Sequence, residues 1–137
     1  MKKEKLKSKP RLFRQEKIYS CAVACLRMVL DFYGCERDEV SLCELCATDY
    51  SGTSPDALVA AAQQLGFNAE KRYADIFDLM DYQKLGLFPI LFINLLSIDG
   101  RDMTHAVVLE SITRNSLKVL DPWQNARSIP IDKFRVA

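Results

Sequence analysis

An almost entirely apolar run near the N-terminus, CAVACLRMVL at residues 21–30, constrains the fold more than any other feature of the sequence. Ser20 is suited to cap a helix before this run, and Gly34 is suited to end one after it. Apart from Arg27 and Asp31, the sides of such a helix are apolar all round, which leaves no face for solvent. The run therefore predicts a buried central helix that ends before Gly34.

The hydrophobic period changes along the rest of the chain, from helical to alternating. Two short helices are predicted first, at residues 38–47 and between Ser54 and Gly66, the latter with Pro55 in its first turn. The order of helices followed by strands predicts an α+β fold, with the first helix packed on an antiparallel sheet. The later predicted segments are strands at 67–73, 89–95, 105–112 and 117–121, a helix at 75–83 and a short segment around 128–134.

Length and charge indicate one domain with a basic N-terminal extension. The chain has 137 residues, of which 49% are hydrophobic, enough to bury a core. Lysines crowd the first residues, and a lysine-rich terminus with few aromatic residues is typical of a solvated tail. We therefore predict a basic flexible arm at residues 1–12 and a domain at residues 13–137, with no nucleic-acid partner.

Membrane and export signals are weak. The apolar stretch at residues 85–98 is too short to span a bilayer and contains Pro89, and the charged N-terminus does not lead into a cleavable apolar segment. Five cysteines, an odd number, favour reduced thiols over a disulfide framework. These features predict a cytoplasmic protein without direct membrane insertion.

Two residues stand out as candidates for nucleophilic chemistry. Cys21 begins the predicted central helix, where backbone N–H groups and the helix dipole stabilise a thiolate. Cys25, one turn further in, is a buried filler by the same argument. His105 is the single histidine of the chain and follows a polar turn at the start of a predicted strand. Any thiol–imidazole mechanism must therefore pair Cys21 with His105.

A cysteine protease also needs a group that orients the imidazole and a donor for the oxyanion. Asp121 ends the strand after that of His105, so a hairpin returns it to the same end, where its carboxylate can bond the ring. A turn centred on residues 114 and 115 places Asp121 nearer to Val108, so a bulge is expected. Gln15 carries an amide that can act as the oxyanion donor together with the Cys21 N–H.

These motifs together resemble the double-glycine leader peptidases, which are papain-like cysteine proteases. The resemblance covers residues 13–137 and depends on several separated motifs. They are Gln15 six residues before Cys21, then Ala24, Leu26 and Met28, FYG at 32–34, SGTSPDALVAAAQQLGFNA at 51–69, HAVVL at 105–109 and VLDPW at 119–123.

The resemblance implies a papain-like fold and a role for each site residue. Cys21 is implied as nucleophile, His105 as general base and acid, Asp121 as the orienting carboxylate and Gln15 as oxyanion donor, with no cofactor and no metal. The implied substrate is a leader-containing precursor peptide cut after a Gly-Gly or Gly-Ala pair. The usual partner in this family is the membrane domain of an ABC transporter, yet the chain has no GxxxxGK[ST] phosphate-binding loop.

Two alternatives remain at the level of sequence. One is a catalytically inactive domain that only binds leader peptides, which the retained set of four site residues argues against. The other is a metal or redox site built on Cys43 and Cys46 with Cys35 and one further ligand. A single CxxC is weak support for such a site, and burial of one face of a short helix explains Cys43 and Cys46 as well.

Overall fold

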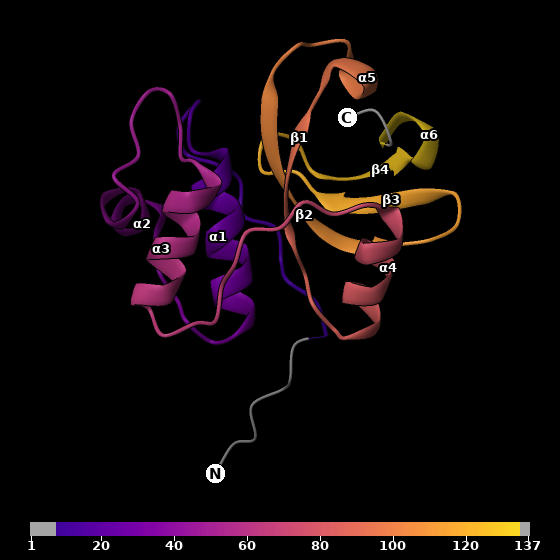
Figure 1. Ribbon diagram of the computed structural model, residues 1–137. Coiled ribbons are helices and arrows are strands. Elements are labelled where there is room, and N and C mark those ends of the chain that lie inside the picture. Colours follow the sequence, from indigo (N-terminus) through magenta and orange to yellow (C-terminus); the bar gives the residue numbers. More distant parts are fainter. Residues whose placement is uncertain (1–7, 135–137) are drawn as a thin grey trace.

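The computed structural model describes residues 8–134, which form one antiparallel sheet with helices on both faces (Figure 1). The strands lie in the order β1-β2-β3-β4. This arrangement confirms the predicted α+β class with N-terminal helices packed on the sheet. The elements are α1 Cys21–Phe32, α2 Glu39–Leu45, α3 Pro55–Gln64, α4 Ile76–Lys84, β1 Ile90–Asn94, α5 Leu96–Asp99, β2 Thr104–Ile112, β3 Ser116–Leu120, β4 Ala126–Pro130 and α6 Ile131–Phe134.

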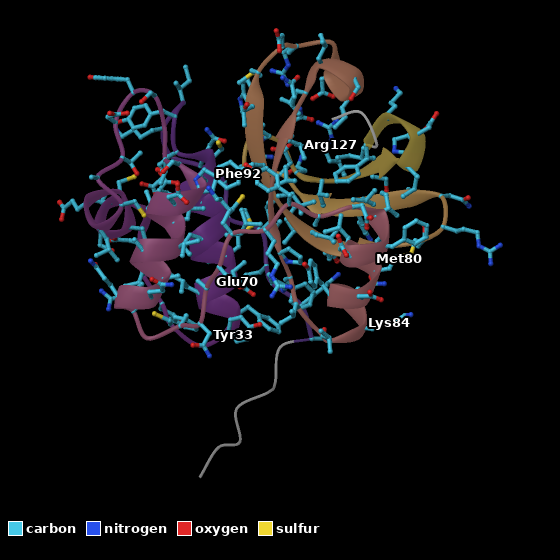
Figure 2. All side chains as sticks on the ribbon, in the orientation of Figure 1. Tyr33, Glu70, Met80, Lys84, Phe92 and Arg127 are labelled. Atoms are coloured by element: carbon cyan, nitrogen blue, oxygen red, sulfur yellow. The ribbon has the colours of Figure 1, made fainter. Side chains whose placement is uncertain are left out.

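Side chains of β2 alternate between two apolar cores, one on each face of the sheet. Ala106 and Val108 pack with α1, α2 and α3, whereas Val107 and Leu109 pack with α4 and the residues of β3 and β4. Phe92 of β1 contributes to the first core, between the helices and the sheet (Figure 2). The double coverage explains why β2 is apolar on both sides and makes it the central support of the fold.

The helix α1 has the predicted position, but its start is stabilised differently from the prediction. Ser20 makes no side-chain capping bond to the helix. Its hydroxyl instead accepts the N–H of Lys17 and lies 3.0 Å from Oε2 of Glu39, a buried carboxylate of α2. Asp38 and Ser54 do cap α2 and α3 through their side chains. The segment before Cys21 is thus fixed by tertiary contacts, which a local pattern does not reveal.

The predicted strand at 67–73 is wrong. Phe67 and Ala69 do pack against the core, as the alternation suggested, but the segment pairs with no strand in the described part of the chain. It crosses from the helical layer to α4 instead, so its alternation reflects one-sided burial. The short helix α5, in the connection between β1 and β2, was not predicted from the sequence.

The predicted flexible arm needs correction for its last residues. Residues 1–7 lie outside the described part, but Pro10 is buried and its neighbours make ion pairs with the domain. Nζ of Lys9 is 2.7 Å from Glu110 of β2. Arg11 donates two hydrogen bonds to the buried Asp31 of α1. Within residues 8–134, no helix combines the length and the apolar character that crossing a bilayer requires.

Candidate active site

The first residue of α1, Cys21, lies in a cleft between the helical layer and the sheet. The cleft has a volume of about 460 Å³. Its walls come from α1, from the loop between α2 and α3, and from the adjoining ends of β1 and β2. The lining residues are Cys21, Ala22, Cys46, Ala47, Asp49, Ser51, Gly52, Thr53, Ser54, Pro55, Ala57, Phe92, Thr104, His105 and Ala106. Cys21 and His105 therefore face the same space.

His105 and Asp121 form a buried pair at the end of the β2–β3 hairpin. Nε2 of His105 is 2.7 Å from Oδ1 of Asp121, and each side chain is 2% exposed. The same oxygen accepts the backbone N–H of Trp123 at 2.9 Å. Because the imidazole binds Asp121 through Nε2, its Nδ1 is left for a second partner. Cys21 lies close enough to this ring for His105 to lower the pKa of its thiol.

The expected bulge in β2 accounts for this reach. The register with β3 shifts between Leu109 and Ser111, so that Glu110 is an extra residue. Continuing the shifted register places Asp121 opposite Val107, one residue closer to His105 than an unbroken hairpin gives. Diagonal neighbours across a strand pair are within reach of longer side chains. The bulge is therefore what lets the carboxylate meet the ring.

The electrostatics of the site favour a charged thiol and a charged imidazole. Burial alone raises the pKa of Cys21, but hydrogen bonds with His105 and with backbone groups outweigh it and lower the pKa below its ordinary value. Burial likewise opposes the charge on His105, yet Asp121 and Cys21 raise the pKa of His105 to about 9. A thiolate–imidazolium pair is therefore favoured between the lowered pKa of Cys21 and the raised pKa of His105.

The neighbouring cysteines have the opposite environment. Cys25 is fully buried one turn further along α1, and desolvation raises the pKa of its thiol well above the ordinary value. Desolvation also raises the pKa of Cys46 to about 11. Among residues 8–134, no three His, Cys, Asp or Glu side chains gather to hold a metal ion. The set proposed around Cys43, Cys46 and Cys35 is thus not assembled there.

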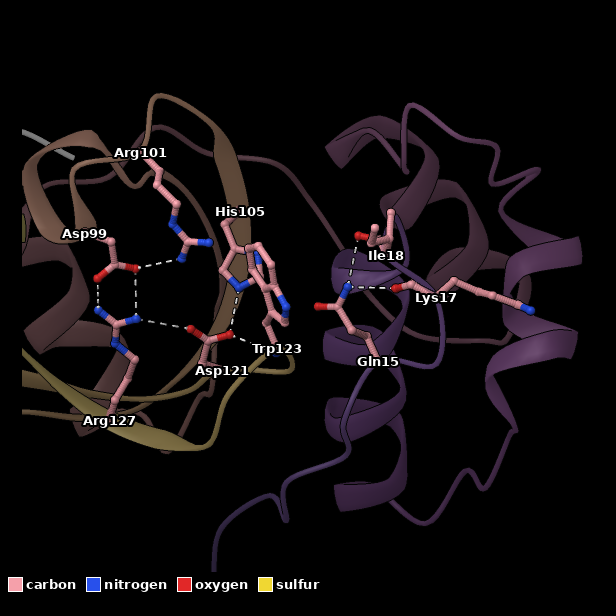
Figure 3. A network of polar contacts seen from close by, with 9 residues as sticks. All are labelled: Gln15, Lys17, Ile18, Asp99, Arg101, His105, Asp121, Trp123 and Arg127. Carbon is pink, nitrogen blue, oxygen red and sulfur yellow. Dashed lines mark hydrogen bonds and ion pairs between the residues drawn. The ribbon is translucent and has the colours of Figure 1, made fainter.

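Gln15 lies beside the site, but its amide N–H groups are engaged elsewhere. Nε2 of Gln15 donates to the carbonyl oxygens of Lys17 at 2.7 Å and Ile18 at 3.1 Å. Figure 3 shows the amide oxygen on the opposite side, toward His105; within the described residues this buried oxygen has no hydrogen-bond partner. The backbone N–H of Gln15 donates to Pro122, next to Asp121. A role as oxyanion donor therefore requires the amide to turn.

Three residues at the site were missed by the reasoning from sequence. Asp99 of α5 and Arg127 of β4 form an ion pair beside Asp121, and the guanidinium of Arg101 lies 4.4 Å from the centre of the Trp123 ring (Figure 3). No local motif marks these positions, because they come from elements whose placement only the folded sheet defines.

Comparison with known proteins assigns the arrangement to a family. The model of the peptidase C39 family matches residues 9–136. The chain belongs to the peptidase C39 family. A pediocin PA-1 transport/processing ATP-binding protein of Pediococcus acidilactici is 31% identical over 117 residues, covering 85% of this chain and 16% of that protein. An uncharacterised Methanothermobacter marburgensis protein is 32% identical and is covered over 79% of its length.

Solved structures of this C39 family agree with the fold. The peptidase domain of Streptococcus ComA, described as a bifunctional ABC transporter, superposes with a TM-score of 0.77 at 28% identity, covering 90% of this chain and 88% of that one. A C39-like peptidase from Bacillus anthracis shares the fold with a TM-score of 0.72 at 17% identity, with 95% and 89% coverage. The predicted papain-like fold of this C39 chain is confirmed. The chain spans about a sixth of the length of its transporter relatives (16%).

Proposed function

We propose that this chain is a cysteine endopeptidase that cleaves leader peptides after a Gly-Gly or Gly-Ala pair. The observation that carries the proposal is the cleft in which Cys21 faces His105, itself bound to the buried Asp121 at 2.7 Å. A charged thiol at a helix start, paired with an imidazolium and open to a cleft, is suited to acyl transfer.

The chemistry proceeds through a thioester. The Cys21 thiolate attacks the carbonyl carbon of the scissile bond, and His105 gives its proton to the departing amine. Water, activated by the now neutral His105, then attacks the thioester and releases the leader with a free carboxylate. Asp121 holds Nε2 of His105 throughout, which leaves Nδ1 to exchange the proton with the reacting groups.

The oxyanion that forms in each step needs donors near Cys21. The backbone N–H of Cys21 is among the first N–H groups of α1, which lack acceptors within the helix. In this proposal Gln15 supplies the second donor after its amide turns from the carbonyls of Lys17 and Ile18. In the present orientation Oε1 of Gln15 has no hydrogen-bond partner among the described residues, so the amide bonds only through its N–H groups.

The names of similar proteins support the proposed substrate and partner. Similar proteins are described as transport/processing ATP-binding proteins, and one double-glycine protease of the same fold is described in complex with a leader peptide. We infer that this chain processes a leader-containing precursor in the cytoplasm, at the cytosolic face of a membrane that holds an ABC exporter.

Cleavage of a synthetic peptide tests the proposal. A leader ending in Gly-Gly and followed by several core residues should be cut once, after the pair, and changing the second Gly to Val should block cleavage, because a narrow slot admits no branched side chain. Cys21→Ser should abolish cleavage of the first peptide. Binding of the Gly-Gly peptide without cleavage by the reduced protein would instead identify an inactive leader-binding domain.

A further inference from the structure

A second carboxylate, outside the cleft, is connected to the His105–Asp121 pair through an arginine. Arg127 of β4 binds Asp99 through two contacts, Nη2 to Oδ1 at 2.6 Å and Nη1 to Oδ2 at 3.0 Å. The same Nη1 lies 3.5 Å from Oδ2 of Asp121 (Figure 3). The groups thus alternate in charge from His105 through Asp121 and Arg127 to Asp99.

The two oxygens of Asp121 have different partners. Oδ1 receives His105 and the backbone N–H of Trp123, whereas Oδ2 faces Arg127. A buried carboxylate with one oxygen fixed in this way cannot rotate its other oxygen away from the imidazole without losing a charged contact. Arg127 therefore determines which oxygen His105 meets.

Asp99 also supports the aromatic cover of the same bond. Nη2 of Arg101 lies 3.2 Å from Oδ2 of Asp99, and the Arg101 guanidinium stacks on the ring of Trp123. That ring packs against His105, with 5.8 Å between the ring centres. The carboxylate of Asp99 thus binds two arginines. Arg127 contacts Asp121, and Arg101 stacks on the Trp123 ring that packs against His105.

We propose that Asp99 and Arg127 are positioning residues, which hold the Asp121 carboxylate in the orientation that meets the His105 ring. The proposal goes beyond the peptidase assignment but rests on it for its kinetic test. The charged groups around His105 are Cys21 from α1, Asp121 after β3, Arg127 from β4, and Asp99 and Arg101 from the β1–β2 connection.

The two positioning residues have opposite charges, so removing each charge has an opposite effect. In Asp99→Asn, Arg127 is no longer neutralised and attracts Asp121 for itself, which destabilises the positive charge on His105. In Arg127→Gln, a positive charge near His105 is lost, which stabilises the imidazolium, and Asp121 loses the contact to Oδ2 that holds its orientation. The opposite shifts report that both charges act on His105, and turnover reports the positioning of Asp121.

The test measures the rate of Cys21 alkylation by iodoacetamide from about pH 5 to about pH 10, a range that spans the ordinary pKa values of His and Cys. Peptide mapping distinguishes Cys21 from the other cysteines. The inflection at high pH reports His105. We expect it at lower pH in Asp99→Asn and at higher pH in Arg127→Gln, each by roughly half a pH unit. Asp102→Asn is the matched control, because Asp102 lies in the same loop but binds Asn94.

Cleavage of the Gly-Gly leader peptide gives the second readout. We expect kcat to fall about 10-fold or more in both variants with KM unchanged, as for a misplaced reacting group. Arg127→Lys keeps the positive charge but replaces the planar, two-pronged guanidinium. Its alkylation profile should match that of the wild type, while its kcat should lie between those of Arg127→Gln and the wild type. This variant also keeps the test valid if Asp99→Asn fails to fold.

Two results overturn the proposal. One is an inflection that moves in the same direction in both charge-removing variants, and the other is an equal shift in Asp102→Asn. If no leader peptide is cut by the wild-type protein but the alkylation shifts appear as described, the proposed substrate falls, while the electrostatic coupling of Asp99 and Arg127 to His105 stands.

Discussion

Cys21 differs from the other cysteines in a way that a simple labelling experiment measures. Because its pKa is lowered while those of Cys25 and Cys46 are raised, brief iodoacetamide treatment near pH 6 should modify Cys21 first. Peptide mapping by mass spectrometry identifies the labelled site. The selectivity should fall at higher pH, where ordinary thiols ionise as well.

His105→Ala provides the control for that assignment. Removing the imidazolium takes away the hydrogen bond that lowers the pKa of Cys21 and leaves desolvation, which raises it. Labelling of Cys21 at pH 6 should therefore slow strongly, while Cys43→Ser should leave it unchanged. Equal labelling of Cys21 and Cys25 in the wild-type protein would show that Cys21 is an ordinary buried thiol.

Gln15→Ala separates a role in the transition state from a structural one. If the amide turns to stabilise the oxyanion, kcat should fall about 100-fold or more with KM little changed. The thermal midpoint reports the loss of the bonds to Lys17 and Ile18 in the same variant. A drop in thermal stability with unchanged kcat would assign Gln15 to the support of the loop before Cys21.

The sequence predicts part of this site because part of it is local. Cys21 follows from a helix start, and the meeting of His105 with Asp121 follows from a hairpin of known length with a bulge. Arg127 and Asp99 have no comparable signal, because their contact depends on β4 pairing with β3 and on an unpredicted helix. Side-chain orientation, as for Gln15, is likewise set by tertiary contacts.

At the scale of elements, α2 fixes the segment that precedes the nucleophile. Glu39 is 2% exposed, and its Oε2 accepts the N–H of Glu16 at 2.8 Å and lies 3.0 Å from the Ser20 hydroxyl. Its other oxygen is buried without a hydrogen-bond partner among the described residues. One side chain of α2 therefore holds both ends of the loop that leads to Cys21.

Glu39→Gln tests the charge of that contact. Burial raises the pKa of Glu39 despite the two hydrogen bonds, so its contribution to stability is complete below the ordinary value of 4.5 and is lost as the pH rises through the folded-state pKa. Relative to wild type, Glu39→Gln should therefore gain stability as the pH rises above 4.5 in urea unfolding. Glu39→Ala, which removes the acceptor, should lose about 1–3 kcal/mol. An unchanged difference between wild type and Glu39→Gln across this range would contradict a raised pKa.

Element patterns were reliable where a helix or strand packs on one consistent partner. The helix α3 is capped by the side chain of Ser54, and α4 is capped by that of Asp75. The segment at 67–73 has a strand-like alternation because Phe67 and Ala69 face the core, but within the described part of the chain, residues 8–134, it pairs with no strand. The alternation of apolar residues in a segment indicates which of its side chains are buried. Whether the segment pairs as a strand depends on the arrangement of the whole sheet.

At the scale of the whole molecule, the N-terminal strap, residues 9–15, joins the helical layer to the sheet. Lys9 binds Glu110 of β2, Arg11 binds Asp31 of α1, and the N–H of Gln15 binds the carbonyl of Pro122. The strap thus connects the two layers between which the cleft lies.

Shortening the chain through this strap tests that contribution. A protein that begins at residue 12 should have a lower thermal midpoint than one that begins at residue 8, because Asp31, with 3% of its side chain exposed, loses the Arg11 guanidinium. Arg11→Ala should account for most of the difference. Lys9→Ala should account for little, since the Lys9 side chain is 59% exposed and such pairs contribute weakly. Circular dichroism melts at pH 7 provide the comparison, and equal midpoints for the two shortened proteins would show that the two layers hold together without the strap.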